Sequence, residues 1–104
     1  MAQTMLKTQA VNYASTTAVA GTEFGETPFF PGGNCLLNLS AVVSGTVKVQ
    51  GNETTATAGD AGWTDLATIT GAGPFEIYNI MKYMRVQPTV AGTGTAVATF
   101  EGIQ

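Results

Sequence analysis

Apolar and polar residues alternate along much of the chain from Cys35 onward, with the period of two that marks a half-buried β-strand. Every second residue of the segment 35–43 is apolar, and Val47 and Val49 alternate with polar residues within 46–50. Further strands are expected at 5–13, 63–70, 75–79, 82–87 and 95–101, with a Gly-rich turn at 71–74 and a loop at 91–94. No window of helical length keeps apolar residues at i, i+3 and i+4. The pattern predicts an all-β chain of about seven strands folded as an antiparallel β-sandwich.

The first 34 residues are less regular than the rest. The run 14–20 has no large apolar residue except Val19, and the following segment 21–34 combines aromatic residues with prolines that prevent regular ladder pairing. These residues are Phe24, Pro28, Phe29, Phe30 and Pro31. We expect the run 14–20 to be an extended connection or an edge strand, residues 1–34 together to form an extended N-terminal arm with a Phe/Pro loop, and residues 35–104 to form the sandwich body.

Two interpretations of the Phe/Pro loop stay open. An aromatic loop braced by prolines orders with little loss of entropy, so it can anchor an interface with another subunit. Alternatively, the rings plug one end of the chain's own sandwich, because a domain of 104 residues needs its large side chains for its core.

Composition narrows the possible partners. Only 11% of the residues are charged, against about 25% in an ordinary soluble domain, which suits a surface that packs against neighbours. Four Lys and Arg residues and a net charge of -3 leave too few cations to neutralise several phosphates, so we expect no nucleic-acid partner. No apolar run approaches the ~18 residues of a membrane span, so we expect no membrane partner. A lone Cys and the lack of an apolar segment at the start favour a chain made in a reducing cytoplasm.

The residue types needed for catalysis are largely missing. The chain has no His, so its serines lack the commonest general base, and one Cys cannot form a zinc cluster. Glu53 and Asp65 could pair as two carboxylates, but a pocket for them in so small a sandwich is not expected. Asn52, Glu53, Asp60 and Asp65 suggest calcium, yet their spacing matches no compact calcium loop. We expect neither an enzyme nor a bound metal or cofactor.

The remaining candidates are one Arg and three aromatic residues. Arg85 is expected on an outer face, or paired with Glu76 across a hairpin at 75–87, or bridging to a neighbouring subunit. Trp63 is expected in the sandwich core, and Tyr78 and Tyr83 at its edges. The alternative is that the three aromatic rings form a platform for a sugar.

The order of segments from Cys35 to Gly102 resembles a known class of proteins. The segments SGTVKVQGN, WTDL, KYMRV and GTAVATFEG are similar to those of small jelly-roll or Ig-like β-sandwich proteins encoded near the capsid genes of tailed bacteriophages, most of all the decoration or cement proteins. This resemblance implies a structural virion protein on the capsid exterior that binds the major capsid protein across neighbouring subunits. It also implies a homo-oligomer, with a trimer favoured. The Phe/Pro loop residues and Arg85 would then contribute to the interface.

Two alternative functions stay open beside the decoration of a capsid. One is a module of a phage tail or fibre that binds host glycans. The other is a head-completion or tail-tube subunit, which would form rings or polymers.

Overall fold

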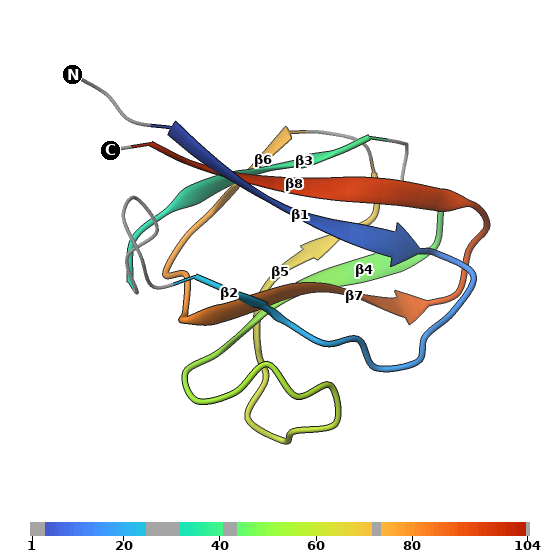
Figure 1. Ribbon diagram of the computed structural model, residues 1–104. Coiled ribbons are helices and arrows are strands. Elements are labelled where there is room, and N and C mark those ends of the chain that lie inside the picture. The colour runs from blue at the N-terminus through green and yellow to red at the C-terminus, as the bar shows by residue number, and fades with distance from the viewer. Residues whose placement is uncertain (1–3, 25–31, 41–43, 72–73, 104) are drawn as a thin grey trace.

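The computed structural model describes residues 4–24, 32–40, 44–71 and 74–103 of the 104-residue chain. Within these residues the protein is all-β, with eight strands in two packed antiparallel sheets (Figure 1). The strands are β1 (Thr4–Asn12), β2 (Thr22–Glu23), β3 (Cys35–Leu39), β4 (Thr46–Asn52), β5 (Thr64–Ile69), β6 (Pro74–Ile77), β7 (Tyr83–Val90) and β8 (Thr95–Ile103). No helix long and apolar enough to cross a membrane occurs in the part of the chain that the structure describes.

The strand order is that of a jelly roll. One sheet has the order β1-β8-β3-β6 and the other β2-β7-β4-β5, and we call them sheet A and sheet B. The first strand pairs with the last, the second with the seventh, the third with the sixth and the fourth with the fifth. This is the pairing of one long antiparallel ribbon rolled up into two sheets. The expected antiparallel sandwich is confirmed.

The core lies between the two sheets and follows from the alternation along the strands. Val47 and Val49 on β4 point inward and are fully buried, as are Leu37 on β3 and Phe100 on β8. The ring of Phe24 meets that of Phe100 edge to face, with centroids 5.1 Å apart. Each such side chain contributes about 1.5–3 kcal/mol through burial of apolar surface.

The N-terminal segment differs from the extended arm that we expected. β1 pairs with β8 without a register break over all nine of its residues, and β2 pairs with β7. Residues 4–24 are therefore part of the sandwich, and a boundary between residues 34 and 35 does not separate an arm from a body. The physical reason is that β8 has backbone hydrogen-bonding groups along both of its edges. β3 pairs with only one edge, and β1 satisfies the groups of the other.

The hairpin expected at 75–87 does not form. β6 belongs to sheet A and β7 to sheet B, so the chain crosses between the sheets at residues 78–82. Asn79 makes the crossing in a left-handed conformation, with φ of 58°. Ile80 then fixes the chain through backbone hydrogen bonds with Gly32 and Gly33.

Candidate functional site

The outer face of sheet A is nearly uncharged. Alternation turns Leu6, Thr8 and Ala10 of β1 outward, and these residues lie opposite Glu101, Thr99 and Val97 of β8. On β3 and β6 the outward positions continue with Asn38 opposite Pro74 and with Leu36 opposite Glu76. Leu6 and Val97 are 57% and 45% exposed. Glu76 and Glu101, on either side of Leu36, are the only charged residues at the outward register positions of this sheet within the described residues.

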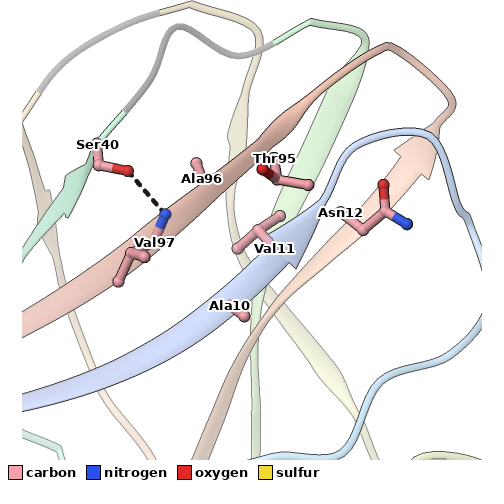
Figure 2. A pocket seen from close by; sticks show the side chains of 7 residues that line it. All are labelled: Ala10, Val11, Asn12, Ser40, Thr95, Ala96 and Val97. Atoms are coloured by element: carbon pink, nitrogen blue, oxygen red, sulfur yellow. Dashed lines mark hydrogen bonds between the residues drawn. The ribbon is translucent and has the colours of Figure 1, made fainter.

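Two shallow hollows lie on the same face. The larger, of about 490 Å³, is lined by Ala10, Ser40 and Val97 among others (Figure 2). Its floor is fixed because the backbone N–H of Val97 donates to Oγ of Ser40 at 2.8 Å. The smaller, of about 230 Å³, lies at the other end of the sheet, around Leu36 and the two glutamates. A largely apolar hollow with few polar groups suits the side chains of a protein partner.

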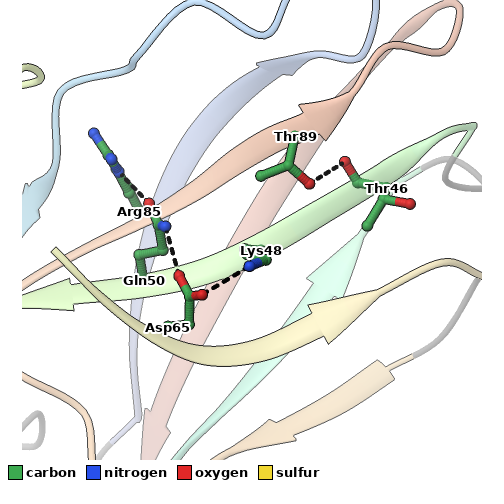
Figure 3. Close-up of polar contacts among 6 residues, drawn as sticks. All are labelled: Thr46, Lys48, Gln50, Asp65, Arg85 and Thr89. Atoms are coloured by element: carbon green, nitrogen blue, oxygen red, sulfur yellow. Dashed lines mark hydrogen bonds and ion pairs between the residues drawn. The ribbon is translucent and has the colours of Figure 1, made fainter.

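The outer face of sheet B has a different character, because a chain of polar contacts crosses it (Figure 3). Nε of Arg85 donates to Oε1 of Gln50 at 2.8 Å, and Nε2 of Gln50 donates to Oδ1 of Asp65 at 2.7 Å. Lys48 completes the chain through its Nζ, which is 2.8 Å from Oδ2 of Asp65. The hydrogen bonds from Lys48 and then Gln50 hold the pKa of Asp65 below its ordinary value. These polar groups therefore satisfy one another within the chain.

Arg85 also fastens two loops onto sheet B. Its Nη1 donates to the carbonyl of Val19 at 2.7 Å and to that of Ala58 at 2.9 Å. The guanidinium lies 4.1 Å from the ring centroid of Trp63, and burial lowers its pKa. Arg85 is only 6% exposed. Of the alternatives given for it, the pairing with Glu76 is wrong, because Glu76 lies on β6 of the opposite sheet.

Gln87 holds the connection between β1 and β2 beside the same strand. Its Oε1 accepts from the backbone N–H of Val19 at 2.9 Å, and its Nε2 donates to the carbonyls of Thr16 and Thr17. Arg85 and Gln87 thus use side-chain groups to bind a segment that has no ladder of its own. The outer side of sheet B along β7 is covered by this chain's own backbone.

The aromatic residues take three separate settings. Trp63 is half-buried outside the core, stacked on Arg85 with its Nε1 donating to the carbonyl of Thr57 at 3.0 Å, so the expectation of a core Trp is wrong. Tyr83 lies on sheet B, with Nζ of Lys82 5.4 Å from its ring. Tyr78 is 56% exposed and follows β6. Because the ring of Trp63 stacks on Arg85 of the same chain, this arrangement does not favour a shared platform of three rings for a sugar.

In the oxygen-rich loop at 52–60, the side chains of Asn52 and Asp60 bind other groups of this chain. Oδ1 of Asp60 accepts from the N–H of Gly62 and from Nδ2 of Asn52, and these bonds lower the pKa of Asp60. Oδ1 of Asn52 accepts from the backbone N–H groups of Thr54 and Thr55. Asp65 belongs to the Lys48 pair instead. No group of three or more His, Cys, Asp or Glu that could hold a metal ion occurs among the described residues.

The structure places Phe24 in the core of the chain, at 1% exposure. It has no free surface to offer a partner directly, so the core interpretation holds for this ring. Pro28, Phe29, Phe30 and Pro31 lie outside the described residues, and their interface role stays a prediction.

No protein-family model, no curated protein and no solved structure matches this chain. The candidate site therefore rests on its geometry. Sequence reasoning did not find the face of sheet A, although the outward residues Thr8 and Ala10 could be read from the strand expected at 5–13. It also did not find Gln87, since nothing in the sequence marks the carbonyls that this amide binds.

Proposed function

We propose that the protein is a structural virion component that decorates and stabilises a bacteriophage capsid, and that it docks through the outer face of sheet A. The contrast between the two outer faces carries this proposal. The outer face of sheet B is polar, internally satisfied and partly covered, whereas that of sheet A is nearly uncharged and uncovered within the described residues. Few charged groups lose their hydration when such a face docks, so little desolvation cost offsets the free energy gained by burying its apolar area.

The size of the face sets what one copy can contribute. Four strands about 4.8 Å apart and about seven residues at about 3.3 Å each give about 400 Å². A stable interface buries about 800 Å² per partner. One face therefore gives a weak contact, and several linked copies bind far more tightly by avidity. Jelly rolls occur in viral capsid proteins and in lectins, so the fold alone does not choose between these functions.

The test is cosedimentation of the protein with heads of the phage that encodes it. Val97→Glu places a charge in the larger hollow, and we expect binding at least about tenfold weaker, since burying an unpaired charge costs more than 1.4 kcal/mol. Thr68→Glu is the matched control, because it adds the same charge on sheet B opposite Lys48. Equal binding of the two variants, or no binding of the native chain to the heads, would contradict the proposal.

The same preparation addresses the alternatives. Binding to a glycan array without binding to heads would favour a tail or fibre module. Rings or tubes of the purified protein in electron micrographs would favour a head-completion or tail-tube subunit.

A further inference from the structure

Most strand edges of the sandwich carry a feature that blocks pairing with another chain. β2 has only two residues, and β6 has four and begins at Pro74. β5 pairs with β4 through a register shift at Gln50. β7 extends beyond β2, and there the side chain of Gln9 caps it: Nε2 donates to the carbonyl of Val86 at 2.9 Å, and Oε1 accepts from its N–H at 2.8 Å. Short strands, proline, bulges and capping side chains all protect sheet edges.

β1 is the exception. It lies at the edge of sheet A, has nine residues without a proline or a register break, and pairs only with β8 among the described strands. The backbone N–H of Tyr13, just after β1, donates to the carbonyl of Gly94 at 3.0 Å, and this bond shows which residues of β1 face β8 with their backbone groups. Odd-numbered residues of β1 therefore bond to β8, because bonding direction alternates along an antiparallel strand. The N–H and C=O groups of Leu6, Thr8 and Ala10 point to the open edge.

We propose that β1 pairs antiparallel with β1 of a second copy of this chain about a two-fold axis at Thr8. Such a contact is isologous, so each copy presents the same strand to the other. The three open residues of each copy then supply three N–H donors and three C=O acceptors to the partner. Main-chain pairing of this kind is the β-augmentation that exposed sheet edges support.

The sequence of β1 complements itself in this register. Thr8 lies opposite Thr8 of the second copy, and the large Leu6 lies opposite the small Ala10. Lys7 is the one charged residue of the strand, and it lies opposite Gln9, so no like charges face each other. The hydrogen-bonded pairing runs from Leu6 opposite Ala10 to Ala10 opposite Leu6.

Pairing through β1 also enlarges the docking face. The two A sheets become one continuous sheet of eight strands, and the outward residues of both copies lie on the same side. The joint face of about 800 Å² reaches the size of a stable interface on one partner. This consequence rests on the proposed function, whereas the pairing itself does not. It makes a two-fold dimer the basic unit, in place of the trimer that the resemblance favours.

The first experiment is native mass by light scattering, followed by oxidative cross-linking of Thr8→Cys. We expect twice the 10.7 kDa of the chain. A hydrogen-bonded antiparallel pair has Cα atoms about 5.5 Å apart, which suits a disulfide across the two-fold axis. Thr99→Cys is the matched control: it lies beside Thr8 on the same face but on β8, away from the edge, and should stay uncrosslinked. The native Cys35 is buried and does not compete.

The second experiment blocks the edge. Thr8→Pro removes an N–H that points to the open edge and leaves the ladder with β8 intact, so it should weaken dimerisation at least about tenfold. Thr8→Val keeps the N–H and should remain a dimer. A native monomer at ~100 μM would overturn the proposal and leave the edge to an extended segment of another protein.

A dimer in which Thr8→Cys does not cross-link would place the contact on another surface and also overturn the proposal. Head binding is not needed for any of these results, so failure of the docking face and failure of the β1 pairing are separately visible.

Discussion

Replacement of Arg85 by Met tests whether this residue holds the two loops of sheet B in place. Met has a similar length and can still pack on Trp63, but it leaves three acceptors at 2.7–2.9 Å without their donor. Hydrogen bonds from a charged group contribute about 1.5–3 kcal/mol, and water reaches part of this site after the change. Loss of the cation–π attraction between the guanidinium and the Trp63 ring adds about 0.5–1 kcal/mol. We expect Arg85→Met to lower the free energy of unfolding by about 3 kcal/mol.

Arg85→Lys separates charge from geometry. Lys keeps the positive charge, but one ammonium group cannot reach Gln50, Val19 and Ala58 together as the planar guanidinium does. We therefore expect a loss of about 2 kcal/mol, much closer to the Met variant than to the native protein.

Urea unfolding followed by fluorescence measures both changes, because Trp63 is the single Trp of the chain and stacks on Arg85. At about 4–8 °C per kcal/mol, the Met variant should also melt at least about 12 °C lower than the native protein. Amide hydrogen exchange at 15–21 and 53–63 should become faster than in the core strands. A Lys variant as stable as the native protein would refute the reasoning, because charge alone would then suffice.

Three further results are expected. Phe24→Ala should cost about 3–5 kcal/mol in urea unfolding, since it empties a buried site against Phe100. Burial raises the pKa of Cys35 to about 12, so a thiol reagent at about pH 8 should label it only after unfolding. The lowered pKa of Asp65 stabilises the fold above about pH 4, and this contribution is lost as the pH falls through that lower value. In Asp65→Asn, and to a smaller extent in Lys48→Met, the free energy of unfolding should therefore fall less steeply with decreasing pH than in the native protein.

Each of these expectations has a clear opposite. A folded Phe24→Ala protein of native stability would return that ring to an interface role. Rapid labelling of the native thiol would mean that Cys35 is open to solvent. An unchanged acid limb in Asp65→Asn would show that the pair with Lys48 does not stabilise the folded state.

Strands whose alternation was unbroken could be predicted from the sequence. Val47 and Val49 are both buried as expected. When one face of a strand packs on a core, alternation allows only the register that turns the apolar residues inward. β2 was not predicted, since its two residues carry no period. The pairing of β1 with β8 was not predicted either, because it joins the two ends of the chain and no local pattern specifies a partner so distant.

The candidate site was less predictable than the fold. Trp63 was expected in the core because large aromatic side chains usually lie there, but it covers Arg85 on the outside of sheet B. Arg85 was expected on an outer face, or paired with Glu76, or bridging to a neighbouring subunit, and its hydrogen bonds go to two backbone carbonyls and an amide oxygen of this chain. Backbone acceptors exist at every residue, so their sequence positions carry no information about which of them a side chain will reach.

Three polar residues explain why the outer faces of the two sheets differ in how much of this chain's own backbone covers them. Gln9, Arg85 and Gln87 stand at strand positions where alternation predicts either a core contact or solvent, and each binds backbone from a segment about 70 residues away. Their hydrogen bonds use backbone groups of this chain along β7. On the outer face of sheet A, the long-range hydrogen bond from the backbone N–H of Val97 to Oγ of Ser40 joins β8 to the end of β3 and brings no further segment of the described chain over the sheet. The outer face of sheet A and the open edge of β1 therefore stay hydrated in a single copy. A binding partner gains the most free energy by excluding water there.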